Sequence, residues 1–177
     1  MISKKNIVIT GGSSGIGKQL ASDLLRQNNK VIIASNDLHK LECARQELSN
    51  ISPDIDSYYV DVSDLNSVRD FVDKVIFNHG CPDILVNNAG YATYRTFEET
   101  PIDEIEHLVS VNLLGAIRCA HFFLPAMLAQ GHGSILNIAS IAGKMVITPN
   151  CTYGASKHGM VGWSEALKYE LSRFNIN

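Results

Sequence analysis

The sequence predicts an α/β fold, a doubly wound parallel sheet with helices on both of its faces. Short apolar segments alternate with longer segments in which apolar residues recur every three or four positions, as in alternating strands and helices. The apolar segments are continuous, which is typical of strands that are covered on both faces. The 177 residues suffice for one domain with a single core, and no linker or repeat divides them.

Three strands and three helices are expected in the first half of the chain. The strands are the apolar segments Asn6–Thr10, Lys30–Ser35 and 57–61. Residues at helical spacing follow each strand: Ile16, Leu20 and Leu24, then Leu38, Leu41, Arg45 and Leu48, then Val68, Phe71, Val72, Val75 and Ile76. Ser63 is expected to cap the third helix.

Two more strands and two long helices are expected in the second half. The strands are 83–86 and 133–139. The longest helix is expected to open at Thr100 and Pro101, with threonine as its cap, and Pro125 should kink or end it. A last helix covers 152–174.

Composition argues against several classes of function. The net charge is −3 without a basic run, which argues against nucleic-acid binding. No apolar stretch approaches the roughly 20 residues of a membrane span. The apolar segment near the N-terminus is too short for a signal peptide. The four cysteines are dispersed without a C-x-x-C pair, so we expect reduced thiols in a cytoplasmic protein and no metal site.

The stretch TGGSSGIGKQ, which ends at Gln19, fits more than one chemistry. Lys18 occupies the lysine position of a triphosphate-binding loop, but Gln19 lacks the hydroxyl that holds magnesium. Asp61, at the end of an apolar strand, could imitate the metal-binding aspartate, so that interpretation stays open. A hydrolase elbow with Ser13 as nucleophile is excluded, because no earlier strand-to-helix connection precedes Gly11 to supply the oxyanion loop.

The spacing of Gly11, Gly15 and Gly17 favours dinucleotide binding instead. The glycines stand between the first strand and the helix after it. Glycines let the backbone approach a pyrophosphate, and the helix N-terminus offers it free N–H groups and a positive dipole. A plain glycine-rich turn has the same pattern, so other residues must decide.

Tyr153 and Lys157 form a candidate acid/base unit near the start of the last helix. Four residues apart, they share one helix face. A tyrosine phenol has a pKa of about 10, and a nearby ammonium favours its ionised form. An ordinary surface pair would have the same spacing.

Two polar residues strengthen the catalytic interpretation. Ser140 follows the fifth strand at its carboxyl end, where ligands of open parallel sheets bind. Asn112 continues the apolar face of the long helix, where a buried amide needs partners. A helix cap and a satisfied core amide remain alternatives for them.

Together the motifs resemble those of the short-chain dehydrogenase/reductase family. They are TGGSSGIG, the Asn87-Asn88-Ala89-Gly90 turn, Asn112, Ser140, and Tyr153 with Lys157, in the family's order over nearly the whole chain. The resemblance implies a Rossmann-type fold in which residues 1–177 form a single dinucleotide-binding domain that also holds the catalytic residues. It implies an NAD(P)-dependent oxidoreductase that interconverts a carbonyl and an alcohol.

The resemblance also implies individual roles. Tyr153 would be the general acid/base. Lys157 would favour the ionised phenol and hold the nicotinamide ribose, Ser140 would fix the substrate oxygen, and Asn112 would hold a water that connects Lys157 to solvent. The implied cofactor-binding residues are Gly11, Ser13, Ser14, Gly15, Ile16, Gly17, Ser35, Asn36, Asp61, Val62, Asn88, Ala89, Gly90, Tyr153 and Lys157.

The choice between NAD and NADP is made at the end of the second strand. The family's acidic position for NAD falls on Ser35 and its basic position for NADP on Asn36, so neither rule applies. Asp37 could still reach a ribose, and Ser35 and Asn36 could instead hydrogen-bond a phosphate. We expect a slight preference for NADP, because no carboxylate stands at the position that would repel the extra phosphate.

Several questions stay open at this point. The chain stops at Asn177, where a sixth strand would be starting, and the family's later strands and substrate loop are not in the sequence. A non-catalytic NAD(P)-binding sensor or interaction module on the same fold remains an alternative. The partners expected are a small-molecule carbonyl or alcohol and other copies of the chain, in a homodimer or homotetramer. The side chains that could face such a copy, or simply the core, are Phe122, Phe123, Met160 and Trp163.

Overall fold

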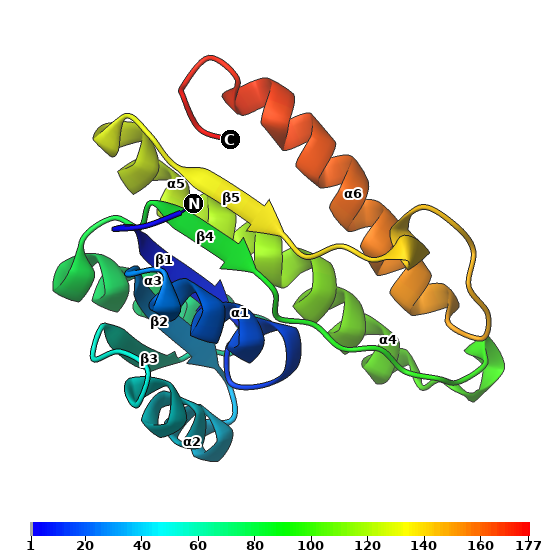
Figure 1. Ribbon diagram of the computed structural model, residues 1–177. Helices are drawn as coiled ribbons and strands as arrows, with labels where there is room; N and C mark the ends of the chain where they lie inside the picture. The colour runs from blue at the N-terminus through cyan, green and yellow to red at the C-terminus, as the bar shows by residue number, and fades with distance from the viewer. Residues whose placement is uncertain (1) are drawn as a thin grey trace.

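A five-stranded parallel sheet forms the centre of the computed structural model, which describes residues 2–177 (Figure 1). The strands are β1 (Asn6–Thr10), β2 (Lys30–Ser35), β3 (Ile55–Tyr59), β4 (Ile84–Asn87) and β5 (Ser134–Asn137). Their order across the sheet is β3-β2-β1-β4-β5, and every neighbouring pair is parallel. The predicted α/β class with a doubly wound parallel sheet is therefore confirmed.

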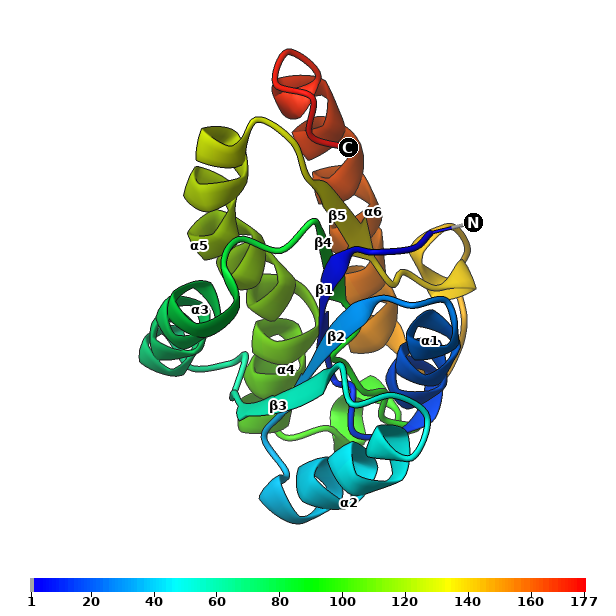
Figure 2. The same cartoon turned by 60° about the vertical axis from the view of Figure 1, so that its left-hand side comes forward.

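Helices cover both faces of this sheet. They are α1 (Gly15–Arg26), α2 (Leu38–Ser49), α3 (Leu65–His79), α4 (Ile102–Val109), α5 (Gly115–Gln130) and α6 (Cys151–Leu171). Figure 2 shows α3 and α5 on one side of the sheet and α1 and α2 on the other.

Successive side chains of β1 serve opposite faces of the sheet. Val8 packs with Phe71 of α3 and Phe123 of α5 in one buried cluster. Ile7 and Ile9 belong to the second cluster, which contains the buried residues of α1 and α2. This double burial explains why the strands are continuously apolar.

The third strand lies earlier in the chain than predicted. It covers Ile55–Tyr59 in place of 57–61, so Asp61 follows the strand instead of ending it. Asp64, not Ser63, caps α3 by accepting a hydrogen bond from the Asn66 N–H at 2.9 Å. Ser63 donates its hydroxyl to Asp61 Oδ1 at 2.6 Å, so Ser63 orders the loop before the cap.

The fifth strand is shorter than the predicted 133–139, and the chain continues the sheet beyond it. Gly133 forms a parallel bridge with Ile176. The Ile135 N–H donates to the Asn177 carbonyl at 2.7 Å, and the Asn177 N–H donates to the Gly133 carbonyl at 3.0 Å. These bonds lie where the sequence predicts that a sixth strand begins.

The long helical run differs from the prediction at both ends. Thr100 does not cap it, because its hydroxyl donates to the Thr96 carbonyl at 2.7 Å beside the short 3-10 helix η1 (Phe97–Glu99). Pro101 takes the cap position, and α4 follows it. Pro125 neither ends nor breaks α5, which continues to Gln130. Phe123 and Met127, on either side of the proline, are fully buried. The stabilisation from this packing outweighs the loss of one backbone hydrogen bond at the proline.

A π-helical turn, η2 (Ser110–Leu114), joins α4 to α5. The resulting run Ile102–Gln130 has 29 residues, and its most apolar window has a mean hydropathy of 1.4. By length and composition it could therefore cross a membrane, and the expectation that no stretch approaches this length is wrong. The core helix of a globular domain meets the same criteria, and Cys119, Phe123 and Met127 of this run are fully buried in the fold.

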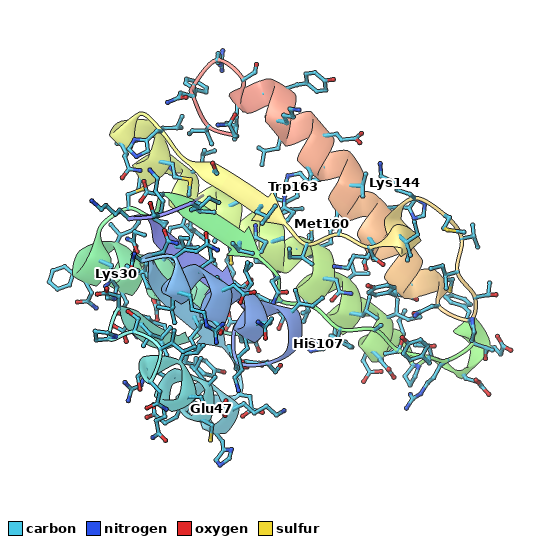
Figure 3. The ribbon with its side chains drawn as sticks, in the orientation of Figure 1. Lys30, Glu47, His107, Lys144, Met160 and Trp163 are labelled. Carbon is cyan, nitrogen blue, oxygen red and sulfur yellow. The ribbon has the colours of Figure 1, made fainter. Side chains whose placement is uncertain are left out.

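The aromatic and methionine side chains suggested for a contact between copies face the core. Phe123 and Met160 are buried, and Phe122 and Trp163 pack against the buried cluster beneath α5 and α6. Figure 3 shows Met160 and Trp163 on α6 near β5. Phe123 and Met160 are therefore core residues, whereas Phe122 and Trp163 are only partly buried, and the expected contact between copies stays a prediction.

Candidate active site

A pocket of about 590 Å³ lies at the carboxyl ends of the strands. The chain passes from β1 to β2 on one side and reaches β4 on the other, so the sheet order reverses between β1 and β4. Ligands of open α/β sheets bind at such a reversal. Residues from the loops after all five strands line the pocket: Gly11, Ser13, Ser14, Gly15, Ile16, Ser35, Asn36, Asp37, Lys40, Val60, Asp61, Val62, Asn88, Ala89, Gly90, Tyr91, Ala92, His107, Val111, Ile138, Ala139, Tyr153 and Lys157.

The glycine turn is built for close approach of an anion. Gly11 has φ +65°, and a Cβ added there would lie 2.9 Å from the Ala89 Cα. The first turn of α1 contains no acidic residue, and the side chain of its cap, Ser14, makes no hydrogen bond to the helix. The backbone N–H groups at this helix start therefore suit the pyrophosphate of a dinucleotide.

Gly17 has a different position from the other glycines of the turn. It is buried and does not line the pocket. A Cβ on Gly17 would lie 2.5 Å from the Gly11 carbonyl oxygen. Gly17 therefore lets α1 pack closely behind the turn, and the sequence pattern cannot separate this packing role from a contact with cofactor.

Thr10 is a structural residue of the site that the sequence reasoning missed. Its Oγ1 accepts hydrogen bonds from the backbone N–H groups of Asn88 and Ala89, both at 3.2 Å. The Asn88 side-chain amide donates to the carbonyls of Thr10 and Gly11 at 3.0 and 3.1 Å. These bonds tie the turn after β4 to the glycine turn, so both walls of the pocket are held together.

Tyr153 and Lys157 line the opposite end of the pocket, near β5. The Lys157 Nζ lies 5.8 Å from the centroid of the Tyr153 ring and donates to the Ile138 carbonyl at 2.8 Å. Lys157 is only 5% exposed, and this burial lowers the pKa of its ammonium. The phenol ring and the buried ammonium therefore share this end of the pocket.

Ser140 lies just outside the pocket, on the segment that packs against α6. It caps the short 3-10 helix η3 (Ile141–Gly143) by accepting a hydrogen bond from the Ala142 N–H at 3.2 Å. Gly143 brings this segment so close to α6 that an added Cβ would lie 2.6 Å from the Lys157 carbonyl oxygen. The serine hydroxyl keeps its own proton for donation to another acceptor.

Asn112 is fully buried in the π-helical turn, as the sequence predicts for an amide with partners. Its Oδ1 accepts from the Tyr91 N–H at 2.9 Å, and its Nδ2 donates to the Tyr91 carbonyl at 2.8 Å. A weaker bond reaches the Ser156 hydroxyl at 3.4 Å. The side chain thus positions the pocket-lining Tyr91, and its predicted water contact remains a prediction.

The end of β2 forms the far end of the pocket. Ser13 donates to the Ser35 hydroxyl at 2.9 Å, and Ser35 accepts from the Asp37 N–H at 3.3 Å. Asp37 caps α2 by accepting from the Lys40 N–H at 3.0 Å, and its other oxygen pairs with the Lys40 Nζ at 2.9 Å. These two bonds with Lys40 lower the pKa of Asp37, and they occupy both of its oxygens.

The chain matches the short chain dehydrogenase family over residues 5–177. It belongs to that family.

Relatives and solved structures are similar to it over nearly the whole chain. A dehydrogenase/reductase SDR family protein 7-like from Drosophila melanogaster is 34% identical over 98% of this chain and 54% of its own length. A metagenomic short-chain oxidoreductase in complex with NADP is 31% identical, with a TM-score of 0.93 and coverage of 99% of this chain and 80% of that one. NAD⁺-bound xylitol dehydrogenase is 27% identical, with a TM-score of 0.94 and coverage of 99% and 68%. The chain spans about half the length of the first curated relatives that it matches.

Within the family's fold, several pocket residues escaped the sequence reasoning. They are Lys40, Val60, His107, Val111, Ile138 and Ala139. Most adjoin predicted residues, and that adjacency was the available signal. His107 of α4 (Figure 3) lies one helical turn before Val111, and its ring is 5.9 Å from that of Tyr91. Among residues 2–177, no group of three His, Cys, Asp or Glu side chains could hold a metal ion.

Proposed function

We propose that this chain is the NAD(P)-binding and catalytic part of an oxidoreductase that interconverts a carbonyl and an alcohol. One observation carries the proposal: Tyr153 and Lys157 line the same pocket as the glycine turn. A dinucleotide with its pyrophosphate at the start of α1 would therefore have its reactive end near the phenol. When bound, the dinucleotide supplies or accepts the hydride.

The residues of the chain would supply the proton and the geometry. Tyr153 would protonate the carbonyl oxygen during reduction and take the alcohol proton during oxidation. Lys157 would stabilise the phenolate and hold the ribose next to the nicotinamide, and Ser140 would donate its hydroxyl to the substrate oxygen. Asn112 supports this arrangement through its two hydrogen bonds to Tyr91.

For the cofactor, we infer NAD(P) with a slight preference for NADP. No carboxylate occupies position 35 or 36, and Asp37 is engaged as the cap of α2. The similar structures do not separate the two cofactors, since one is a complex with NADP and another is bound to NAD⁺.

The test is Tyr153→Phe, which removes one oxygen and keeps the ring. We expect turnover of NAD(P)H with a panel of carbonyl compounds to fall by at least about 100-fold, the lower end of general acid–base contributions, while cofactor still binds. Tyr169→Phe is the matched control, since Tyr169 is on the same helix, is 80% exposed and lies outside the pocket.

Equal turnover of the Tyr153→Phe variant and the unchanged chain would contradict the proposed role. Cofactor binding without turnover of any carbonyl by the unchanged chain would favour the non-catalytic sensor instead.

A further inference from the structure

Arg118, in the first turn of α5, holds the loop that follows β3. Its Nη1 lies within hydrogen-bonding distance of three acceptors: the carbonyls of Val62 and Ser63, at 3.1 and 2.9 Å, and the Ser110 hydroxyl, at 3.1 Å. The guanidinium therefore joins two successive carbonyls of the loop to the π-helical turn before α5. A guanidinium suits this task because it stays charged and its N–H groups keep fixed directions.

The loop that Arg118 holds also forms part of the pocket wall. Asp61 and Val62 line the pocket, whereas Arg118 itself does not. Val62 is buried against the start of α5, where a Cβ added at Gly115 would lie 2.8 Å from the Val62 Cβ. On the other side of the loop, the Asp61 N–H donates to the Ser67 hydroxyl of α3 at 3.0 Å. The loop is thus held between two helices, and Arg118 supplies its polar contact with α5.

This loop lies at the end of the pocket that is remote from the proposed chemistry. In the sheet, β3 is two strand spacings beyond β1, or about 10 Å. Lys157 lies on the other side of β1, beside the carbonyl that follows β5, and Figure 2 shows β3 and β5 at opposite edges of the sheet. With its pyrophosphate at the start of α1, a dinucleotide would therefore have its adenosine half at this loop.

We propose that Arg118 is a positioning residue for the adenosine half of the cofactor, and that it acts through the loop 61–63 without touching the cofactor. The inference rests on the proposed function, namely that the pocket binds NAD(P). Without the guanidinium, the carbonyls of Val62 and Ser63 lose this donor, and the ligand must order the loop when it binds. The apparent affinity then falls by the fraction of molecules in which the loop is in place.

The test is Arg118→Met, which keeps a long side chain and removes its donors. We expect the Kd values of NADH, NADPH and 5′-ADP to rise by the same factor, at least about tenfold, which corresponds to one hydrogen bond to a charged group. Isothermal titration calorimetry measures the three values. The kcat at saturating NADPH should stay unchanged, because Tyr153 and Lys157 lie at the other end of the pocket. A merely structural role would lower the free energy of unfolding and leave the three Kd values of the folded chain unchanged.

Three further variants make the result specific. Arg69→Met is the matched control, since Arg69 lies over the Phe122 ring at 5.5 Å, outside the pocket, and its loss should leave each Kd unchanged. Arg118→Lys should recover part of the affinity, because an ammonium keeps the charge and can donate to the same carbonyls. Ser110→Ala removes one acceptor of Arg118 and a 3.4 Å bond to the Ser63 carbonyl, so it should weaken 5′-ADP binding by a smaller factor.

Unchanged 5′-ADP affinity in Arg118→Met would overturn the assignment, and so would equal losses in Arg118→Met and Arg69→Met or a lower kcat with unchanged affinity. If Arg118→Met does not fold, Ser110→Ala decides, and unchanged 5′-ADP affinity in that variant overturns the assignment. Failure of the unchanged chain to bind NADH, NADPH and 5′-ADP would overturn the proposed function and the assignment with it.

Discussion

Replacement of Asn112 by alanine tests how the π-helical turn supports the pocket. The change removes two hydrogen bonds to the backbone of Tyr91, at 2.9 and 2.8 Å, and leaves the N–H and carbonyl of Tyr91 without these partners. Each bond contributes about 1 kcal/mol and each backbone group left unpaired adds to the loss, so we expect about 3 kcal/mol less free energy of unfolding. For a chain of this length, that lowers Tm by about 6–12 °C.

Equilibrium denaturation in urea, followed by circular dichroism, measures the difference. Asn78→Ala is the control, because Asn78 is exposed and donates one hydrogen bond, to the Tyr58 hydroxyl at 3.0 Å. We expect less than about 1 kcal/mol for the control. An equal loss in both variants would show that the backbone of Tyr91 does not depend on the Asn112 amide, and the reasoning would be refuted.

Two further changes test the glycine turn and the acid stability. Gly17→Ala places a Cβ 2.5 Å from a carbonyl oxygen of the glycine turn, so fluorescence titration should show weaker NAD(P)H binding. Gly162→Ala is the control, because a Cβ there meets open space and cofactor binding should stay normal. Equal NAD(P)H binding by the two variants would contradict the packing role of Gly17. Burial alone would raise the pKa of Asp83, but bonds from the Asn6 N–H and Lys5 outweigh it and lower that pKa. The ionised Asp83 therefore stabilises the fold above its unfolded pKa of about 3.9, and this stabilisation is lost as pH falls through the lower folded pKa. In Asp83→Asn, the free energy of unfolding in urea should fall less steeply between about pH 5 and 2. The same slope in the variant and the unchanged chain would refute this role of Asp83.

The sequence predicts the buried parts of the fold better than its edges. β1 and β2 match their predicted bounds because both faces of each are covered, so the residues inside their ends, 7–9 and 31–34, are all apolar. β3 is an edge strand that ends at Tyr59, which is 50% exposed, and the weaker apolar pattern shifted its predicted position. The predicted helix end at Pro125 is wrong because a sequence shows that proline lacks a backbone donor but does not show how tightly the side chains around the proline pack.

The same distinction holds for the candidate site. The glycine turn and the pair of Tyr153 with Lys157 are local motifs, and they meet in one pocket. Thr10 could not be predicted, because its partner Asn88 lies 78 positions away in the chain. Lys40 is recognisable only once α2 is seen to begin at the pocket.

The π-helical turn also has a consequence for the phase of the whole run Ile102–Gln130. Met127 follows Leu108 by 19 positions, which at about 100° per residue exceeds five full turns by about 100°. A regular α-helix would therefore point these two side chains in different directions, yet both are buried. The wide turn absorbs one residue and brings them back into phase. Removal of a single residue between 110 and 114 should therefore keep both ends of the run facing the core, while the residues of the turn, Asn112 among them, change position relative to the pocket.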